Sequence, residues 1–499
     1  ASLIKVTDNL NVSSPLRLST THASSYGSGD IATNVQFGAS SLSTNTTGNG
    51  NTAIGNSALR LVSTGTGNTG VGYLSLENNT NSNNTALGYR SLRANTSGSY
   101  NVGVGVDALL GNTSGSANTS IGGLSLSSNI SGGSNTAIGY NSLTSNNTGA
   151  NNTAIGEGSL FSNTTGVNNT TIGLNSLYSN ISGGSNTALG RNALFSNTAS
   201  NNVAVGFEAG YTNTSGVSLT AIGYQALKAS VANYNTAVGD RVLLVNTSGT
   251  ENSAFGYQSM VSNINGNSNV AYGLWTLKNN ISGNNNTAIG NTALFSNTAS
   301  NNTAVGYEAG YSNTSGIEIT ALGYRSLKAN TTGGYNTAVG TDAMSTNTTG
   351  SENTAVGRFS LTTNATGSAN TALGLNSLLN NTTGSSNTAL GHIALNNNNV
   401  GSNNTAVGQS ALYSNTASNN TALGSEAGFS NTSGIEVTAI GYQALRNSTG
   451  SYNTALGHTS LFNNGIGDQN TAVGRTALFT NASGSSNTAT GLASLYANI

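Results

Sequence analysis

Residues 135–155 read Asn-Thr-Ala-Ile-Gly-Tyr-Asn-Ser-Leu-Thr-Ser-Asn-Asn-Thr-Gly-Ala-Asn-Asn-Thr-Ala-Ile, and this pattern decides the fold. The glycine that closes the run Asn-Thr-Ala-Ile-Gly returns every seventeen residues, or occasionally every sixteen, at 28 places from Gly38 to Gly491. A short unit repeated almost without insertion is typical of a solenoid, in which each unit forms one coil stacked on the last. We call this residue the strand-closing glycine and count each coil from it.

The residue before the strand-closing glycine forms an apolar column along the stack. It is Ile, Val or Leu in nearly every coil, as at Ile54 and Val71, with Phe255 and Tyr272 as bulky variants; we call this the aliphatic column. The apolar stretches are only four or five residues long and are bounded by Asn and Gly, which excludes a helix and predicts strands. The sequence therefore predicts an all-β fold, a parallel β-solenoid of about 28 coils with 16 or 17 residues each.

A second apolar column lies four residues after the strand-closing glycine. It is Leu in 23 coils, Met at Met260 and Met344, and Gly in three coils. We call it the leucine column and expect it to be buried. The corner that follows it, Asn-Thr-Thr-Gly or Asn-Thr-Ser-Gly, is predicted to place its Asn and Gly where the backbone needs positive φ.

An asparagine stands immediately before the strand threonine in 25 of the 28 coils, for example Asn51, Asn84 and Asn135. In a stack each one lies against its counterpart in the next coil, so their amides are predicted to hydrogen-bond along the axis as an asparagine ladder. A structural role is the favoured interpretation of this column, and a ligand-binding role is the alternative.

The residue between the strand threonine and the aliphatic column is small in almost every coil, as at Ala53 and Gly70, and only Gln36 and Thr171 depart from this. We call it the alanine column. Adjacent strand residues point to opposite faces, and both columns are restricted, so both faces of the strand are predicted to be covered. One column then faces the coil interior and the other another copy of the chain; the sequence leaves open which is which.

Three coils replace the leucine by glycine within a Glu-Ala-Gly sequence, at Gly210, Gly310 and Gly428. Apolar residues return soon afterwards in each of these coils, which is expected if the core has to stay filled. The returning pairs are Val217 and Leu219, Ile317 and Ile319, and Ile435 and Val437. These coils are either docking marks for lateral partners or inherited duplications.

Composition excludes several function classes. Only 6% of residues are charged and the net charge is -1, so no nucleic-acid partner is expected. No apolar run approaches the roughly 20 residues of a membrane helix, so direct membrane insertion is not expected. Cysteine is absent, and the three histidines, His22, His392 and His458, belong to no catalytic or metal-binding pattern. We predict that the chain is not an enzyme and has no catalytic, cofactor or metal site.

The repeat predicts two segments. Residues 1–33 are nonrepetitive and are expected to form an N-terminal cap or connector, and residues 34–499 a continuous β-solenoid. Tyrosines are the candidate surface contacts, because many directly follow the strand-closing glycine, where an aromatic ring can stack on a sugar or a protein, or else clamp neighbouring coils. These are Tyr73, Tyr89, Tyr140, Tyr224, Tyr257, Tyr307, Tyr324 and Tyr442.

The units 135–143, Asn-Thr-Ala-Ile-Gly-Tyr-Asn-Ser-Leu, and 84–92, Asn-Thr-Ala-Leu-Gly-Tyr-Arg-Ser-Leu, carry a family resemblance. They resemble the Ser-Val-Ala-Ile-Gly repeats of YadA-type trimeric adhesin heads and, more strongly, the Asn-Thr-Ala-Ile-Gly repeats of bacterial and phage tail-fibre-like proteins. The resemblance implies a left-handed β-roll, a homotrimeric fibre, with a higher ring as the alternative, and attachment to surfaces. The coils here have 17 residues rather than about 14, and no binding residue of the family carries over.

These observations give a hypothesis and two rivals. The chain is predicted to be a non-catalytic segment of an extracellular fibre, on a cell surface or virion appendage, that binds a cell-surface glycan or protein receptor. One rival is an ice-binding solenoid, which the sequence disfavours because its threonines stand in narrow strands and corners rather than in Thr-x-Thr rows. The other is a purely structural surface or matrix filament.

Overall fold

The computed structural model describes residues 33–498, which form short strands joined by turns and contain no helix. The chain divides into two compact units, Ala1–Asp240 and Arg241–Ile499, and each is described by itself. The predicted segment 1–33 lies almost entirely outside the described residues, so the division between residues 33 and 34 stays a prediction.

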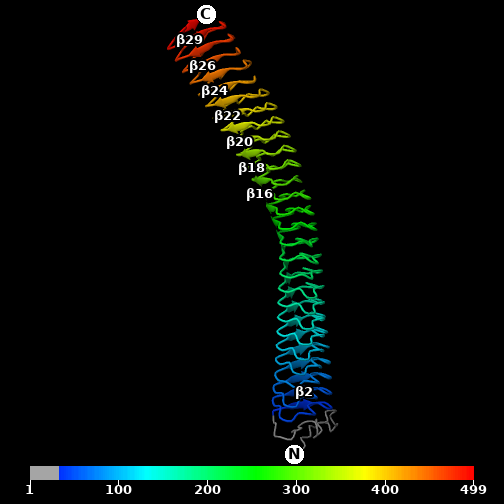
Figure 1. Cartoon of the computed structure of the whole chain (residues 1–499). Coiled ribbons are helices and arrows are strands. Elements are labelled where there is room, and N and C mark those ends of the chain that lie inside the picture. The colour runs from blue at the N-terminus through cyan, green and yellow to red at the C-terminus, as the bar shows by residue number, and fades with distance from the viewer. Residues whose placement is uncertain (1–32, 499) are drawn as a thin grey trace, which may run out of the picture. The chain divides into compact units, whose positions relative to one another are not determined.

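The first unit contains thirteen three-residue strands that pair in parallel in chain order, each with the strand one coil later (Figure 1). They are β1 (Val35–Phe37), β2 (Thr52–Ile54), β3 (Thr69–Val71), β4 (Thr85–Leu87), β5 (Val102–Val104), β6 (Thr119–Ile121), β7 (Thr136–Ile138), β8 (Thr153–Ile155), β9 (Thr170–Ile172), β10 (Thr187–Leu189), β11 (Val203–Val205), β12 (Thr220–Ile222) and β13 (Thr236–Val238).

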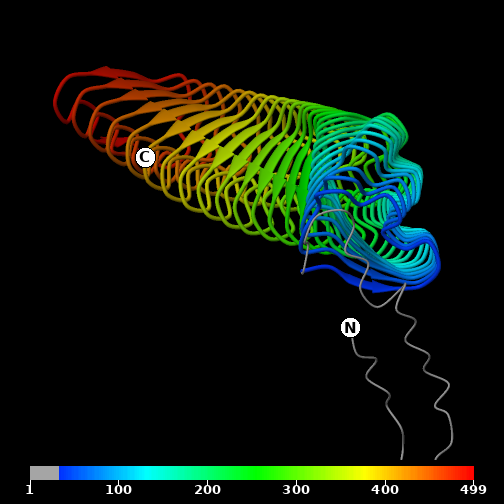
Figure 2. The same ribbon diagram turned by 90° about the horizontal axis from the view of Figure 1, so that it is seen from below.

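The second unit repeats this arrangement with fifteen strands, whose arrows lie side by side in one row in Figure 2. They are β14 (Ser253–Phe255), β15 (Val270–Tyr272), β16 (Thr287–Ile289), β17 (Thr303–Val305), β18 (Thr320–Leu322), β19 (Thr337–Val339), β20 (Thr354–Val356), β21 (Thr371–Leu373), β22 (Thr388–Leu390), β23 (Thr405–Val407), β24 (Thr421–Leu423), β25 (Thr438–Ile440), β26 (Thr454–Leu456), β27 (Thr471–Val473) and β29 (Thr488–Thr490). A separate short pair is formed by β28 (Thr480–Asn481) and β30 (Ala497–Asn498).

The register places like residues over like residues. Thr136 pairs with Thr153, and the alanines and isoleucines that follow them pair in the same way. The predicted parallel β-solenoid is therefore confirmed, with one coil for each repeat of the sequence. Parallel strands of this kind lie about 4.8 Å apart, which sets the axial step of one coil.

The alanine column lies inside the coil and the aliphatic column lies outside. Ala53 and Ala137 are fully buried, whereas Ile54 is 39% exposed. The interior beside this column is narrow: a Cβ added to Gly70 would lie 3.1 Å from Ser75 Oγ and 3.2 Å from Leu59 Cγ, although Thr171 is accommodated there with full burial. The sequence left open which of the two columns faces the coil interior, and the small size of that interior explains why it is the alanine column.

The leucine column is buried, as predicted, but with a backbone that the sequence did not indicate. Leu59 and Leu143 are fully buried and both have a φ of +51°. Leucine and methionine tolerate this left-handed conformation better than β-branched residues do, because their branch lies beyond Cβ. The two leucines therefore combine full burial with a left-handed backbone.

The prediction that the corner asparagine and glycine supply positive φ is wrong. Gly115 and Asn112 are absent from the left-handed region; it is occupied by the leucine column, by the residue two after the strand-closing glycine, and by the residue before the strand asparagine. A Cβ at Gly115 would instead overlap the carbonyl oxygen of Gly132 in the next coil. The corner glycine is needed because the backbones of successive coils approach each other closely there.

Two asparagine ladders run through each unit, although only one was predicted. In the predicted ladder, the side-chain amide of Asn118 donates to Asn101 Oδ1 at 3.2 Å. In the second, the corner asparagine Asn129 donates to Asn112 Oδ1 at 2.7 Å, and to the Gly132 carbonyl at 2.9 Å. The corner asparagines are therefore core residues, since their amides satisfy one another and the backbone.

The coils that contain Glu-Ala-Gly repair their cores in the way predicted, but with fewer residues. Leu219, Ile319 and Val437 are only 1–2% exposed. They stand in the asparagine column and fill the space that the missing leucine leaves. The second predicted filler lies at the surface instead, as Ile317 does at 38% exposure.

Candidate functional site: the outer face of the sheet

Each unit presents a narrow outer sheet face, built from the strand threonines and the aliphatic column. These two residues of each strand point outward because the alanine between them points inward. Exposure along the aliphatic column reaches 48% at Leu87 and Leu423. We call this surface the outer sheet face.

The outer sheet face carries no charged residue in any of the described three-residue strands, although the chain has 14 basic and 15 acidic residues. Its outward positions hold Thr, Val or Ser on one side and aliphatic or aromatic residues, with one Thr, on the other. A surface that faces only water tolerates Lys, Glu and Asp, and a sheet that stays exposed is normally protected by such charges. The outer sheet face of the described strands is therefore an uncharged and partly apolar surface.

The outer sheet face of each unit is comparable in size to one side of a protein interface. Fifteen strands of three residues give a strip of roughly 700 Å² in the second unit, and the thirteen strands of the first give roughly 600 Å². A stable protein interface buries about 800 Å² on each partner. Each strip alone falls slightly short of this area.

Threonines form a regular row on this face. Thr303, Thr320 and Thr337 lie in register on successive strands, at the same place in each. The threonines stand in narrow three-residue strands and do not form repeated Thr-x-Thr rows, as expected, but they do stack into a single row along the axis. The rows are of the Thr-x-aliphatic kind, because the second outward residue of nearly every strand is Val, Ile or Leu rather than Thr.

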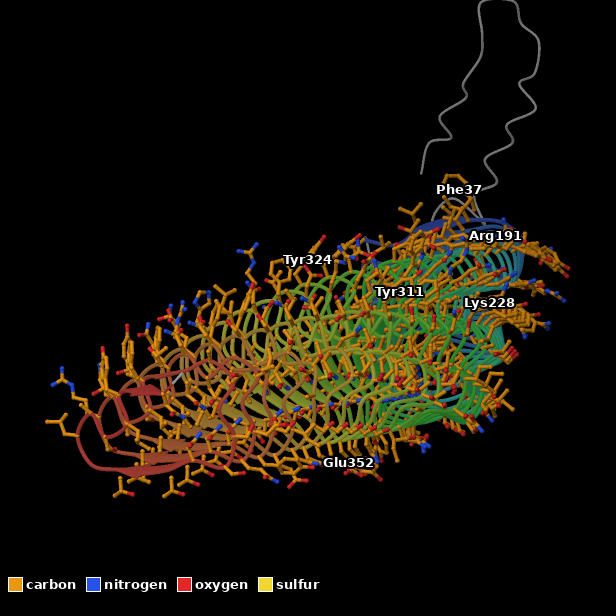
Figure 3. All side chains as sticks on the ribbon, turned by 90° about the horizontal axis from the view of Figure 1, so that it is seen from above. Phe37, Arg191, Lys228, Tyr311, Tyr324 and Glu352 are labelled. Carbon is orange, nitrogen blue, oxygen red and sulfur yellow. The ribbon has the colours of Figure 1, made fainter. Side chains whose placement is uncertain are left out.

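All eight predicted surface tyrosines lie at the surface, with exposed fractions of 41% to 54%. Tyr324 points outward from the ribbon in Figure 3. Its ring stacks on that of Tyr307 one coil earlier, with centroids 5.4 Å apart. Tyr73 and Tyr89 form an equivalent pair at the same separation. In each pair the two rings cover the faces that they turn toward each other. The stacked rings therefore hold neighbouring coils together.

The other four predicted tyrosines have different surroundings. Tyr224 stacks on Phe207 at 5.5 Å, while Tyr257 and Tyr442 are tilted against a tryptophan and a histidine, respectively. Tyr140 instead lies over the backbone of Gly123. Among the eight tyrosines, ring stacking joins only the pairs Tyr73–Tyr89 and Tyr307–Tyr324 in the described residues.

Two further aromatic groups were missed by the sequence reasoning. Tyr100, Tyr234, Tyr335 and Tyr452 are 49% to 67% exposed and have φ near +60°, immediately before the strand asparagine. A second set forms a ladder five residues after the strand-closing glycine, where Phe161, Tyr178, Phe195 and Tyr211 stack with centroids 4.9 to 5.2 Å apart. Aligning the coils residue by residue would have found both sets.

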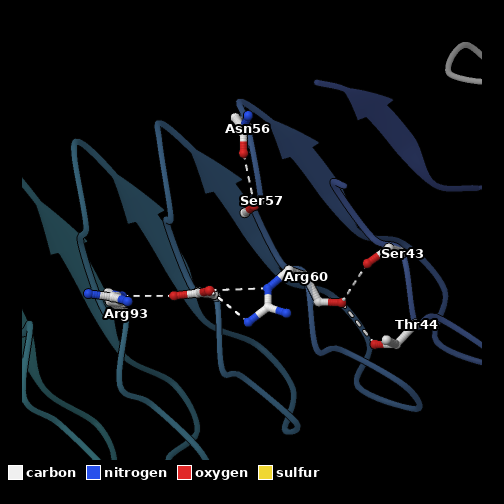
Figure 4. A network of polar contacts seen from close by, with 7 residues as sticks. Ser43, Thr44, Asn56, Ser57, Arg60 and Arg93 are labelled. Atoms are coloured by element: carbon white, nitrogen blue, oxygen red, sulfur yellow. Dashed lines mark hydrogen bonds and ion pairs between the residues drawn. The ribbon is translucent and has the colours of Figure 1, made fainter. Parts of the chain in front are cut away.

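The charged side chains pair along the axis, away from the outer sheet face. Glu77 Oε1 lies 2.8 Å from Arg60 Nη2, and its Oε2 lies 2.8 Å from Arg93 Nε, so one carboxylate joins three coils (Figure 4). The predicted pair of Glu308 and Arg325 also forms, at 3.8 Å. These charges are largely neutralised by one another and give no strong field for a charged ligand.

The Glu-Ala-Gly coils carry the same kind of pair. Glu208 Oε2 lies 2.8 Å from Lys228 Nζ and accepts a hydrogen bond from Gln225 at 2.9 Å. The hydrogen bond from Lys228 lowers the pKa of Glu208, against the opposing effect of burial. Glu426 is held in the same way by Arg446, whose hydrogen bond lowers the pKa of that carboxyl. These contacts hold neighbouring coils together. Because the pKa of each carboxyl is lowered, both carboxyls are ionised near neutral pH and do not donate a proton.

The described residues hold no group of three His, Asp or Glu side chains placed to bind a metal ion. A helix with the length and apolarity to cross a bilayer is likewise absent from residues 33–498. The chain matches no protein-family model and no curated protein sequence. Its candidate site therefore rests on the geometry of the outer sheet face alone.

Proposed function

We propose that this chain is a non-catalytic segment of an extracellular fibre, built from several copies of the chain and used for attachment to cells or surfaces. The observation that carries the proposal is the outer sheet face, which leaves an apolar residue exposed or partly exposed on nearly every strand and carries no charge on any described strand. A second copy with the same face is a complementary partner, because uncharged flat surfaces pack on each other without burying an unpaired charge.

The copies are proposed to form a trimer, with a higher ring as the alternative, and the coil to be left-handed; both points follow from the resemblance to tail-fibre-like repeats. The remaining faces then point outward, with the tyrosine pairs and the exposed tyrosines on them. A fibre of this kind presents the same contacts many times, so weak single contacts with a glycan or protein receptor add up to firm attachment. Its location is an outer cell surface or a virion appendage.

Attachment is tested with microspheres coated with the purified protein and passed over cells under flow. We expect retention well above that of albumin-coated spheres, and glycosidase or protease treatment of the cells distinguishes a glycan receptor from a protein one. The variant Tyr307→Leu/Tyr324→Leu tests one tyrosine pair and should reduce retention. Retention equal to albumin on every surface tried would refute the attachment role.

Ice binding is the second candidate, because regular outward threonine rows on a flat, uncharged face favour it. The two candidates use the same surface and exclude each other, since a face that is covered by another copy does not contact ice. Thermal hysteresis measured on the purified protein separates them. The fibre proposal predicts none, and clear hysteresis from a single-chain species would favour ice binding.

A further inference from the structure

The outer sheet face is almost uniform, and this creates a problem of register for any assembly of copies. If two copies slide by one whole coil, about 4.8 Å, Thr still meets Thr and aliphatic still meets aliphatic. Such a shift loses the contact of a single coil at each end. Uniform strands specify register weakly, so the chain needs an irregular feature that distinguishes one alignment from the others.

One irregular feature of this kind occurs on the outer sheet face of the second unit. Phe255 and Tyr272 stand in the aliphatic column on the adjacent strands β14 and β15, and their rings stack with centroids 4.3 Å apart and planes 12° from parallel. Tyr272 is 41% exposed. The rings project further from the sheet than the Val, Ile and Leu side chains of the neighbouring strands.

The other outward residue of β14 is adjusted to this bulk. Ser253 takes the place of the usual threonine, and it is the one serine in that column among the described strands. Serine lacks the methyl group of threonine, so the added volume of Phe255 is partly offset on the same strand. A smaller residue beside a larger one keeps the total volume constant, which matters where another surface packs against both. The same adjustment has no function where the surface faces water.

We propose that Phe255 and Tyr272 set the axial register between copies of the chain, so that each residue meets the same residue of the neighbouring copy. This inference rests on the proposed fibre. In the parallel, in-register alignment the rings of all copies meet at one height, beside the space left by Ser253. In any alignment shifted by whole coils the rings are forced against aliphatic rows elsewhere, and overpacking of this kind is destabilising.

The test uses distances between spin labels, because the chain has no cysteine and accepts a single new one. Asn291 and Gln409 both directly follow a strand-closing glycine, are exposed, and lie several coils apart in the second unit. Each is changed to cysteine in a separate protein, labelled, and measured by pulsed electron paramagnetic resonance in the assembled fibre. In a parallel, in-register assembly the two labels give the same narrow distance distribution, because equivalent residues lie at equal distances from the axis.

The key variant is Phe255→Leu/Tyr272→Leu, which restores the residue type found in this column in other coils. We expect longer distances to appear and the distribution to broaden, because copies then slip by whole coils. The matched control, Phe295→Leu/Tyr311→Leu, removes another stacked pair, at 5.0 Å, that lies off the outer sheet face, and should leave the distribution narrow. If the double variant fails to fold, each single Leu variant serves in its place.

The outcomes separate the two proposals. A single-chain mass with no distance between labels contradicts the fibre itself. An assembly whose narrow distribution survives the loss of both rings overturns the register proposal and leaves the fibre standing. Distances that differ between Asn291→Cys and Gln409→Cys before any ring is removed indicate antiparallel or staggered copies, and they also overturn it.

Discussion

Asn118 donates its side-chain amide to Asn101 Oδ1 at 3.2 Å, and its own side-chain oxygen accepts the amide of Asn135 at 3.1 Å. The same oxygen of Asn101 also accepts the Asn118 backbone N–H at 3.0 Å. Each ladder asparagine thus joins three coils and satisfies backbone groups that the narrow interior would otherwise leave unpaired. A buried polar group without a partner costs about 1 to 3 kcal/mol.

Replacing Asn118 by alanine is therefore expected to open the stack locally. Several hydrogen bonds are lost at once, and the expected cost is of the order of 3 kcal/mol in local stability. Native-state hydrogen exchange measures this loss at the neighbouring amides, which suits a repeat array that need not unfold in one step. Asn56→Ala, at an exposed position, is the control; equal exchange in the two variants would show that the ladder contributes nothing.

The cores of the Glu-Ala-Gly coils predict that two substitutions, each destabilising alone, compensate each other in a double variant. A Cβ at Gly310 would lie 2.9 Å from Leu294 Cδ2 and 3.5 Å from Ile319 Cδ1, so Gly310→Leu overfills the coil. Ile319→Asn leaves the same coil underfilled, at an expected cost of about 2 to 4 kcal/mol. The two changes together restore the residues of an ordinary coil and should recover most of the stability.

Thermal unfolding of the two single variants, the double variant and the natural protein measures this coupling. Simple addition of the two single losses would contradict the view that Ile319 fills the space of the missing leucine.

The corner glycine gives a steric prediction. Gly115→Ala should lower the melting temperature by several degrees, because the new methyl group overlaps the Gly132 carbonyl oxygen. Gly123→Ala is the matched control, since its methyl group would make only ordinary contacts, with Tyr140 at 3.5 Å and the Val106 carbonyl oxygen at 3.9 Å. If both variants melt alike, close approach of the backbones does not explain the corner glycine.

Ion pairing predicts a dependence on pH. The pKa of Glu208 lies below its ordinary value of 4.5 because Lys228 donates to the carboxylate. A lowered pKa in the folded protein adds stability that is present above about pH 4.5 and is lost as the pH falls through the folded value. Glu208→Gln should therefore destabilise the protein slightly at pH 7, by about 1 kcal/mol at most for so exposed a pair, and hardly at all at pH 3.

Melting curves at the two pH values test this expectation. Glu157→Gln, at an exposed acid in the same unit, provides the comparison. A larger effect of Glu208→Gln at pH 3 than at pH 7 would reverse the predicted sign.

The periodic features of the fold could be predicted from the sequence. Repetition of Thr, Ala and Ile at one spacing is enough to indicate stacked parallel strands, and the buried leucine column and the Asn51 ladder follow from it. The corner glycine was misread because glycine serves two purposes, freedom of φ and absence of a side chain. Only the distance to the next coil tells them apart. Positive φ at Leu59 carries no sequence signal, since leucine rarely adopts it.

The candidate site was harder to predict. Both outward and inward columns of the strand are restricted in size and polarity, so the sequence predicts two covered faces without saying which is internal. The decision depends on the width of the coil, which leaves little space beside Leu59 for a side chain at Gly70. The eight tyrosines lie at the surface, as expected, and their role in contacts stays a prediction. The stacking that covers their faces depends on the register of successive coils.

Charge placed on the outer sheet face should prevent assembly. The variant Ile138→Lys/Ile155→Lys puts two lysines on adjacent strands of this face, where another copy would bury them without partners. We expect it to reduce the mass of the assembly. Ile130→Lys/Ile181→Lys is the matched control, because these isoleucines are 47% and 54% exposed on corners away from the face. Equal masses for the two variants would argue against the outer sheet face as the contact.

The mass of the natural protein in solution, measured by sedimentation equilibrium at micromolar concentration, tests the proposed assembly most directly. Covering of the outer sheet face by copies of the chain predicts a whole multiple of the single-chain mass, with three copies expected. A stable single-chain mass across the concentration range would contradict it.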